Sequence, residues 1–378
     1  MDEILFFYLK TGGGHLAPVR AIAGELSDNF PGRAGPVLLD GMAGAHGFPR
    51  FVIEDGYRIT QARAKWIYEA AYALTKFPPF TYSNSTLVAE VLYRKIEQQI
   101  LAHRAKAIVI SHFFLIAPVL DVLRKHRLAM PVVTIVTDPY TAHPLWFLRK
   151  DVTMVVFSER VRATAVKLGV PAGRVHVFPF ILNNTFSRED LPFRADRTRA
   201  ALGFRNDQKV VLLLGGGDGM PRGFRITKRI LRELPGTGVV LVCGRNEALF
   251  RRGQGLLKTP GGKDLRVFAY VDNVPDLIGA SDAVLTKGGA STLMEILALG
   301  KTPVITTYIW EQEKGNVEFV VGEHRGVYET RISRLPGILR GIFDDAPPYR
   351  LIRETNARTP IPSGTRQVTE LILQQAGL

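Results

Sequence analysis

Residues 283–295 read AVLTKGGASTLME, and this stretch decides the fold class. An apolar run typical of a buried strand ends at a pair of glycines, Gly288 and Gly289. Hydroxyl residues then open a segment whose apolar residues recur with the spacing of a helix. A strand that passes through a glycine turn into a helix is the repeating unit of a parallel α/β sheet covered on both faces.

The same unit recurs along the chain in two series, and each series begins with a strand that runs into glycines. The first series has apolar runs at 3–8, 106–110, 131–137, 153–157 and 174–180. The second series has them at 209–214, 238–243, 264–270, 282–287 and 302–307. Continuous apolar strands that alternate with helices predict parallel sheets, so we predict two doubly wound α/β domains.

A length of 378 residues fits two such domains better than one. Polar, turn-forming residues gather at 181–195 (ILNNTFSREDLPFRA), between the last strand of the first series and the next helix. We therefore predict a first domain over 1–185 and a second domain over 186–354. The C-terminal helix of about 355–378 could pack back on the first domain.

The composition is that of a globular protein with a core, since 46% of the residues are hydrophobic and 22% are charged. The one cysteine, Cys243, excludes a disulfide framework and any metal site built from several cysteines. It indicates a reducing compartment, and we predict a cytoplasmic protein. The acidic N-terminus differs from a signal peptide, and no apolar run reaches the roughly 18 residues that a membrane-spanning helix needs.

The formal net charge is +14 at pH 7, and it is spread over both halves of the chain. Such a surface favours anionic partners, which include nucleotides, nucleic acids and anionic lipid headgroups. An arginine-rich surface without any such partner fits the charge equally well.

The first glycine loop, TGGGH at 11–15, follows the first strand directly. Gly13 and Gly14 let the backbone turn sharply and let a ligand come close to the main chain. His15 is the only side chain of the loop that can exchange a proton near neutral pH, and it is expected at the sheet edge where open α/β sheets bind ligands. A plain turn with a packed histidine is the alternative. The loop lacks the GxGxxG spacing, so a dinucleotide site is only weakly supported.

The second glycine loop, GGGDG at 215–219, opens the second series of strands. The main-chain N–H groups of Gly216 and Gly217 would suit a phosphate or a sugar. A tight structural turn is the alternative.

The third loop follows the strand at 283–286 and is the most specific of the three. Lys287 borders it, and small or hydroxyl residues begin the next helix, where free N–H groups and the helix dipole can bind a diphosphate without a metal. Glu295, about one turn further along, can accept hydrogen bonds from two ribose hydroxyls, whereas a solvated helix acid is the alternative. We expect Gln312 and Glu313 to be exposed loop residues that could read sugar hydroxyls. The residues expected at the helix N-terminus are Gly289, Ala290, Ser291 and Thr292.

These motifs together resemble the GT-B glycosyltransferases. The closest likeness is to the branch that holds the monogalactosyldiacylglycerol synthases and the bacterial processive diacylglycerol glucosyltransferases. The motifs that carry it are TGGGH at 11–15, TD at 137–138 with HPLWF at 143–147, DNVP at 272–275, TKGGAST at 286–292 and QEKGN at 312–316.

The resemblance implies two Rossmann-like domains that face each other across a cleft. It implies an inverting, metal-independent transfer of galactose or glucose from a UDP-hexose to diacylglycerol or a related lipid, with no cofactor. The alternatives are a transferase that moves N-acetylglucosamine to another lipid, a UDP-sugar epimerase of the same fold, and a non-enzymatic protein that binds lipids or nucleic acids.

The resemblance also implies roles for individual residues. His15 would be the base for the acceptor hydroxyl, with Asp138 to orient or assist it and with Gly13 and Gly14 in the acceptor loop. The uracil would lie against Phe268, Tyr270 and Val271, the diphosphate on the helix that begins near Ala290, and the ribose on Glu295. The donor hexose would lie near Gln312, Glu313 and Asn316.

Two motifs depart from the family pattern. Lys287–Gly288–Gly289–Ala290 stands where the family usually has Lys-Pro-Gly-Gly, and Trp310–Glu311 stands where it tends to have Pro-Gly. These differences concern the donor sugar and the acceptor and leave the nucleotide site unchanged.

A lipid acceptor lies in a bilayer, so we expect peripheral binding to an anionic membrane surface and no nucleic-acid partner. Trp66 begins an apolar stripe of helical spacing with basic neighbours, which suits a membrane surface. The alternative is that this stripe faces the domain core. Phe77 and Phe80 belong to a predicted apolar loop at 77–82, which is the better candidate for membrane contact.

Overall fold

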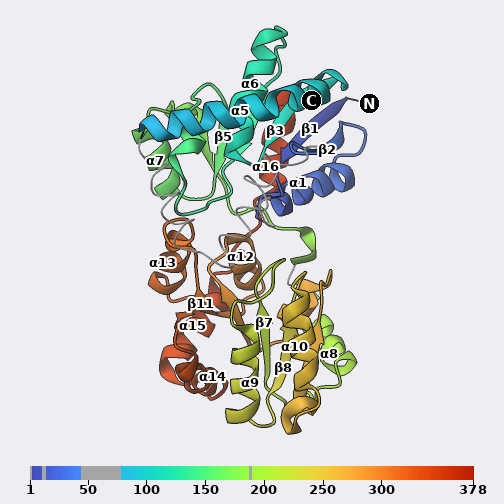
Figure 1. The fold of residues 1–378 in the computed structure, drawn as a ribbon, viewed down its shortest axis with the longest axis vertical. Coiled ribbons are helices and arrows are strands. Elements are labelled where there is room, and N and C mark those ends of the chain that lie inside the picture. Colours follow the sequence, from blue (N-terminus) through green and yellow to red (C-terminus); the bar gives the residue numbers. More distant parts are fainter. Residues whose placement is uncertain (1, 11–13, 44–77, 187–189) are drawn as a thin grey trace. The chain divides into compact units, whose positions relative to one another are not determined.

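The computed structural model describes residues 2–10, 14–43, 78–186 and 190–378. For residues 78–89 it describes the backbone alone. The chain divides into two compact units. The first unit comprises Met1–Asn184, Ile309–Gly315 and Ser363–Leu378, and the second comprises Thr185–Tyr308 and Asn316–Pro362. Figure 1 shows the two units with their elements labelled.

The first unit is built on a parallel sheet of six strands in the order β2-β1-β3-β4-β5-β6. Because the chain leaves β1 in one direction and β3 in the other, the order reverses between these two strands, and open α/β sheets bind ligands at such a point. The strands are β1 (Glu3–Tyr8), β2 (Gly35–Asp40), β3 (Ala105–Ile110), β4 (Val132–Ile135), β5 (Thr153–Val156) and β6 (Val175–Val177).

Helices and short 3₁₀ turns connect these strands. C-terminal helix α16 belongs to this unit, where it contacts α1 and β3 (Figure 1). The helices are α1 (Leu16–Asn29), α5 (Pro78–Leu101), α6 (Ile116–Lys125), α7 (Glu159–Lys167) and α16 (Thr365–Ala376), and the 3₁₀ turns are η2 (Phe113–Leu115), η3 (Pro144–Phe147) and η4 (Ala172–Arg174). A further 3₁₀ turn, η5 (Asn184–Phe186), lies where the chain passes from the first unit to the second.

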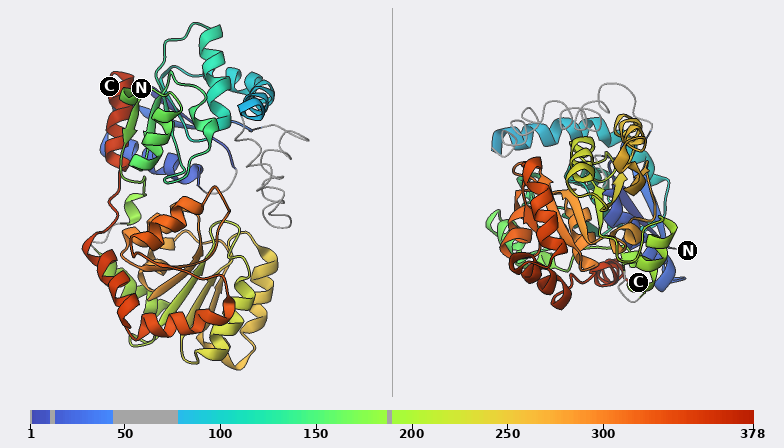
Figure 2. Two further views of the ribbon diagram at one scale, coloured as in Figure 1. Left: turned by 90° about the vertical axis from the view of Figure 1, so that its left-hand side faces the viewer. Right: turned by 90° about the horizontal axis from the view of Figure 1, so that it is seen from below.

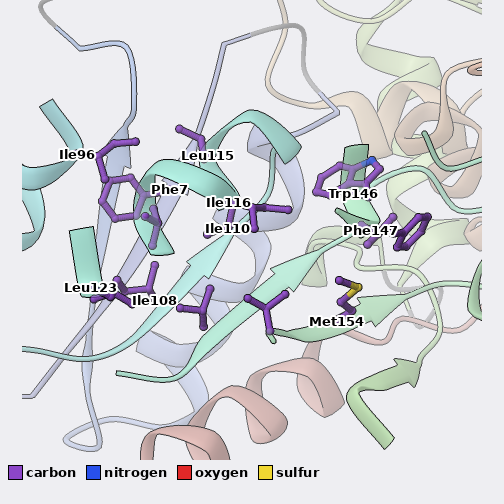
Figure 3. Packing of buried hydrophobic residues seen from close by; sticks show 14 of the residues in the cluster. Phe7, Ile96, Ile108, Ile110, Leu115, Ile116, Leu123, Trp146, Phe147 and Met154 are labelled. Atoms are coloured by element: carbon purple, nitrogen blue, oxygen red, sulfur yellow. The ribbon is translucent and has the colours of Figure 1, made fainter. Parts of the chain in front are cut away.

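The core of the first unit forms where apolar strand residues meet the apolar faces of helices. Ile108 and Ile110 of β3 contact Ile96 of α5 and Ile116 of α6 in one buried cluster (Figure 3). The cluster extends to Trp146 of η3, which is fully buried. The core therefore reaches the carboxyl ends of the strands and supports the residues that follow them.

The predicted apolar loop at 77–82 is wrong for the residues that the structure describes, because α5 begins at Pro78. Pro78 and Pro79 lie in its first turn, where a proline loses no hydrogen bond and its fixed φ suits the helix. Phe80 is therefore a residue of α5. Trp66 and Phe77 lie outside the described residues.

The second unit has a parallel sheet of six strands in the order β9-β8-β7-β10-β11-β12. Its strand order reverses between β7 and β10, as in a dinucleotide-type α/β fold. The strands are β7 (Val210–Leu214), β8 (Gly238–Val242), β9 (Leu265–Phe268), β10 (Ala283–Lys287), β11 (Thr302–Thr307) and β12 (Val327–Tyr328). The helices are α8 (Leu191–Ala201), α9 (Gly223–Glu233), α10 (Glu247–Leu256), α11 (Val274–Gly279), α12 (Ala290–Ala298), α13 (Lys314–Gly322), α14 (Leu335–Phe343) and α15 (Pro347–Arg358), with 3₁₀ turns η6 (Pro260–Asp264) and η7 (Ile332–Arg334).

Alternate residues of β7 are buried on opposite faces of this sheet. Val211 and Leu213 pack in one cluster with Ile226 of α9, and Leu212 packs in another with Ile296 of α12. Figure 2 shows the helices on both faces. A strand buried on both faces must be apolar throughout, which is why these strands were recognisable as continuous apolar runs.

The prediction of two doubly wound parallel α/β domains is confirmed. Two edge strands, β2 and β12, were not predicted. β2 is only half-buried along its length and β12 has two residues, so neither gives a long apolar run. Within the described ranges, no helix combines the length and the apolarity that a bilayer crossing needs.

Candidate active site

The site in the first unit lies at the carboxyl ends of its central strands. His15 follows β1, Ser111 and His112 follow β3, and Thr137 follows β4. Strands β1 and β3 flank the point where the strand order reverses, and β4 lies next to β3, so the fold brings together side chains that are about a hundred residues apart in sequence.

His15 is buried, and its Nδ1 is held by two groups. The carbonyl oxygen of Ser111 lies 2.7 Å from Nδ1, and the hydroxyl of Thr137 lies 2.9 Å from it. A carbonyl can only accept, so Nδ1 carries the hydrogen of the neutral ring and Nε2 keeps its lone pair. Burial lowers the pKa of His15 to about 4, and the Ser111 bond opposes this in part. The ring is therefore neutral at pH 7, with Nε2 ready to accept a proton.

Asp138 is linked to the neighbourhood of His15 through Trp146, whose ring centroid lies 6.4 Å from that of His15. Its Oδ2 accepts a hydrogen bond of 2.8 Å from the indole Nε1–H of Trp146, and its carboxyl group also bonds to the Gln312 side chain. Burial raises the pKa of Asp138 to about 6, against the effect of these bonds. The expected orientation of His15 by Asp138 is wrong in this structure, because Ser111 and Thr137 make the orienting contacts. Whether Asp138 assists the base stays a prediction.

Gln312 and Glu313 belong to the segment of the first unit that spans Ile309–Gly315. The expectation that both are exposed is wrong. Glu313 is buried and accepts a hydrogen bond of 2.8 Å from the backbone N–H of Ile309, and Gln312 is half-buried against Asp138. Glu311, which precedes both of them, has a φ of 68°, which is strained for a residue other than glycine. The sequence could not show that the Glu313 carboxylate bonds to the backbone at the start of its own loop.

The glycine loop at 215–219, which follows β7 in the second unit, is a tight turn whose backbone conformation requires glycine. Gly216 and Gly219 have φ values of 74° and 75°, and the Gly219 N–H donates to the Gly216 carbonyl over 3.1 Å. A Cβ on Gly215 would collide with the Gly219 carbonyl. The turn alone thus accounts for several of these glycines. A Cβ on Gly216 would lie 3.8 Å from Cε of Lys287, so the side chain of Lys287 lies beside Gly216. Gly217 carries the carbonyl that accepts from the Arg245 N–H at 2.8 Å.

Helix α12 begins beside this turn, at the other strand that flanks the reversal. Gly289 is its N-cap residue and provides no side-chain cap, so the N–H groups of Ala290, Ser291 and Thr292 have no intrahelical partner. The Ser291 hydroxyl is buried without a hydrogen-bond partner within the described part of the chain. An anion at this position would find free donors and the positive end of the helix dipole.

Asn316 holds the glycine loop at 287–292 through a side-chain hydrogen bond. It is buried, and its Nδ2 donates a hydrogen bond of 2.9 Å to the carbonyl of Gly288, while the Gly288 N–H bonds to Thr307. The geometry gives Asn316 a contact with the glycine loop at 287–292. Its contact with a donor hexose stays a prediction.

Glu295 points away from any protein partner. Its side chain is half-buried, and no described residue makes a hydrogen bond or ion pair with its carboxylate. Burial raises its pKa to about 7. Burial of the side chain is the cause of this shift. The contact of Glu295 with a ribose stays a prediction. Two hydroxyl donors would satisfy this carboxylate and favour its charged form.

The strand end expected to hold the uracil is partly open. The carbonyl of Phe268 already accepts from the Cys243 N–H over 2.8 Å. The ring of Tyr270 is exposed, with the Arg245 guanidinium 5.8 Å from its centroid. In the described structure, the backbone groups of Tyr270 and Val271 make no hydrogen bond. They are the groups left for a planar base.

Of the remaining predicted residues, Gly14 is an exposed turn residue ahead of α1, and Gly13 lies outside the described residues. Three contributors were missed: Ser111, His112 and Thr137. They follow their strands as His15 follows β1, and this shared placement was the available signal. Across the described ranges, no three His, Cys, Asp or Glu side chains gather as metal ligands would.

Two family models match the chain, one in each half. The model for monogalactosyldiacylglycerol (MGDG) synthase matches residues 15–179, and that for the glycosyltransferase family 28 C-terminal domain matches residues 210–326. The first match includes His15, Ser111 and Asp138, and the second includes the glycine loops and Glu295.

Curated relatives include plant enzymes. A probable chloroplastic monogalactosyldiacylglycerol synthase of Nicotiana tabacum is 24% identical over 351 residues, which cover 90% of this chain and 64% of that protein. Monogalactosyldiacylglycerol synthase 2 of Arabidopsis thaliana is 28% identical over 338 residues, which cover 86% of this chain and 70% of that protein. The chain thus spans about two thirds of the length of these relatives.

Solved structures share the fold at lower identity. The crystal structure of Acinetobacter baumannii MurG matches with a TM-score of 0.59 at 14% identity, and the match covers 99% of this chain and 100% of that one. UDP-GlcNAc 2-epimerase from Neisseria meningitidis, bound to UDP-GlcNAc, matches with a TM-score of 0.62 at 11% identity and covers 98% of each chain. The chain is therefore a glycosyltransferase whose first half is similar to the monogalactosyldiacylglycerol synthases and whose second half is similar to the C-terminal domain of glycosyltransferase family 28.

Proposed function

We propose that the protein transfers a hexose from a UDP-hexose to diacylglycerol, with inversion at the anomeric carbon and without a metal ion. One observation carries the proposal. In the first unit, a neutral His15 with a free Nε2 lies at the carboxyl ends of the strands; in the second unit, the open N-terminus of α12 and the unpaired Glu295 lie at the corresponding ends. The names of the plant relatives favour diacylglycerol as the acceptor and galactose as the sugar.

The nucleotide half of the proposal rests on the second unit. The N–H groups at Ala290, Ser291 and Thr292 would hold the diphosphate, and Glu295 would accept hydrogen bonds from the ribose hydroxyls. The backbone at Tyr270 and Val271 would contact the uracil. A UDP-sugar is further favoured by the epimerase of the same fold, which was solved with UDP-GlcNAc bound.

The chemical step needs one proton acceptor and one stabilised leaving group. The acceptor oxygen attacks the anomeric carbon while its proton passes to Nε2 of His15, and the bond from that carbon to the diphosphate oxygen breaks. The alcohol proton becomes acidic as the new bond forms, so a base of low pKa suffices. UDP leaves with the added negative charge, which the α12 amides and dipole would stabilise in place of a metal. His15 then returns its proton to water.

A single displacement from the side opposite UDP inverts the anomeric carbon. The +14 charge favours peripheral binding to an anionic membrane, where the lipid acceptor resides.

The test is direct. The purified protein is incubated with vesicles that contain diacylglycerol, with UDP-galactose and UDP-glucose in separate reactions and with EDTA present. We expect a monohexosyl diacylglycerol of inverted configuration by mass spectrometry and NMR. Interconversion of UDP-sugars without lipid product would instead favour the epimerase, and loss of activity in EDTA that added divalent metal restores would exclude the metal-independent mechanism.

A further inference from the structure

A second buried histidine lies against the proposed base. The ring centroids of His112 and His15 are 4.5 Å apart, and His112 is only 3% exposed. His112 is the N-cap residue of η2, where its Nδ1 accepts a hydrogen bond of 3.3 Å from the backbone N–H of Phe114. A backbone N–H can only donate, so Nδ1 is unprotonated and the hydrogen of the neutral ring is on Nε2. Burial and the adjacent His15 hold the pKa of His112 well below its usual range, so the ring stays neutral.

The two histidines are therefore opposite tautomers. His15 has its hydrogen on Nδ1 and a lone pair on Nε2, whereas His112 has a lone pair on Nδ1 and a hydrogen on Nε2. Neither Nε2 bonds to a described residue, and neither is among the buried polar atoms without a partner. Each Nε2 therefore reaches solvent, and the pair offers one hydrogen-bond acceptor and one donor to the same small region.

The chemistry of the acceptor decides what the donor can bind. A hydrogen bond to the attacking hydroxyl oxygen would withdraw its lone pair and oppose the reaction. The useful partner is an oxygen next to that hydroxyl that can only accept. In a 1,2-diacylglycerol, the ester carbonyl on the adjacent carbon is such an oxygen.

We propose that His112 is a specificity residue whose Nε2–H binds the ester carbonyl next to the acceptor hydroxyl, while Nε2 of His15 takes the hydroxyl proton. This inference rests on the proposed function. It predicts that the enzyme distinguishes an acyl from an alkyl glycerolipid, because an ether oxygen is a weaker acceptor and has no carbonyl. Binding a carbonyl would also place the hydroxyl at His15.

The chain offers a matched control. His143 is 1% exposed, and its Nδ1 accepts a hydrogen bond of 3.2 Å from the Leu145 N–H at the start of η3. It thus makes the same cap contact as His112. Its ring centroid lies 5.9 Å from that of Phe113, whereas the ring of His112 lies 4.6 Å from Phe113 and 4.5 Å from His15. Asparagine is a good N-cap residue, so His112→Asn and His143→Asn both keep the cap and both lose the Nε2–H.

The experiment measures kcat/KM for 1,2-diacylglycerol and for the matched 1,2-dialkylglycerol, presented in the same vesicles with the same UDP-hexose. We expect wild type to prefer the diacyl lipid at least about tenfold, the size of one lost hydrogen bond to a buried donor. We expect His112→Asn to reduce this preference to less than about twofold, and His143→Asn to keep it. His112→Gln, whose amide N–H₂ reaches the position of Nε2, should keep the preference as well.

The outcomes separate the two proposals. Transfer to both lipids at equal rates by wild type, or an unchanged preference in His112→Asn, overturns the role of His112 and leaves the transferase intact. Absence of lipid product from wild type overturns the proposed function, and the role of His112 with it. Thermal unfolding of each variant shows whether it is folded. If His112→Asn does not fold, the lipid preference of His112→Gln decides the role of His112.

Discussion

At the scale of the residue, the site depends on groups whose protonation is set by burial. His15 is neutral because burial outweighs the Ser111 hydrogen bond, and Glu295 has a pKa of about 7 because it is half-buried without a partner. At pH 7, His15 is thus in the neutral form that a base needs, and Glu295 is close to the pH at which it ionises. Perturbed groups of this kind cluster at functional sites.

Replacing His15 by alanine removes the proposed base. We expect kcat for hexose transfer to fall by about 10² to 10⁴, the usual contribution of a general base. The dissociation constant for UDP, measured by calorimetry, should change less than about twofold, because His15 is not among the nucleotide contacts. Transfer at the wild-type rate would remove His15 from the mechanism.

The binding of UDP should depend on pH through Glu295. Ribose hydroxyls donate to the ionised carboxylate, so binding lowers its pKa from about 7. Affinity should therefore be highest above pH 7 and should weaken as the pH falls below it. In Glu295→Gln this part of the pH dependence should be absent, and affinity at pH 8 should be lower. Because the phosphate of UDP titrates in the same range, the difference between wild type and Glu295→Gln is the quantity to measure.

The stability of the ligand-free protein gives an independent test of the same carboxylate. A pKa raised from 4.5 to about 7 by folding means that the charged form is disfavoured in the folded state. The contribution of the protonated group to stability is fully present below pH 4.5 and is lost as the pH rises through about 7. Glu295→Gln should therefore have a higher Tm than wild type at pH 8, with a smaller difference at pH 5. An equal Tm difference at both pH values would contradict the raised pKa.

At the scale of the element, both sites lie where a strand meets the helix or turn that follows it. In the second unit, the turn after β7 and the N-terminus of α12 meet at the reversal of strand order. The turn has this shape because glycines adopt positive φ values there. The backbone conformation of the turn therefore requires these glycines whether or not a ligand binds there.

Gly219 offers a test of this requirement. Its φ is 75°, and a Cβ would lie 2.5 Å from the Cys243 carbonyl oxygen, so Gly219→Ala should destabilise the protein by about 1–3 kcal/mol. The control is Gly255→Ala in α10, where nothing lies within 4 Å of the added Cβ. That change should leave stability equal or raise it by about 0.4–1 kcal/mol. Urea unfolding measures both, and equal stability of Gly219→Ala and wild type would show that the turn tolerates a side chain.

At the scale of the whole molecule, the chain returns to its first unit at its end. Helix α16 buries Val368 and Ile372 within that unit, and the hydroxyl of Thr365 accepts a hydrogen bond of 3.0 Å from the Leu182 N–H. The sheet that precedes His15 is thus partly covered by a helix from the last residues of the chain.

Truncation after Pro362 removes α16 and exposes the apolar surface of α1 and β3 that it covers. We expect the first unit to lose its cooperative unfolding transition, while calorimetry still finds UDP binding by the second unit. A shorter truncation after Ala376 keeps all of α16, removes only Gly377 and Leu378, and should leave both properties unchanged. Normal unfolding of the protein that lacks α16 would show that the first unit is stable without it.

The sequence by itself determined the two parallel α/β domains, because a strand buried on both faces must be a continuous apolar run. It also determined where the glycine loops of the second unit lie, because a glycine turn at a helix N-terminus is a local arrangement of neighbouring residues. Only the tertiary structure decided which groups hold His15, since Ser111 and Thr137 reach it from other strands. It also decided that Glu313 is buried and that His112 is a tautomer opposite to His15, because burial and hydrogen-bond partners depend on residues distant in the chain.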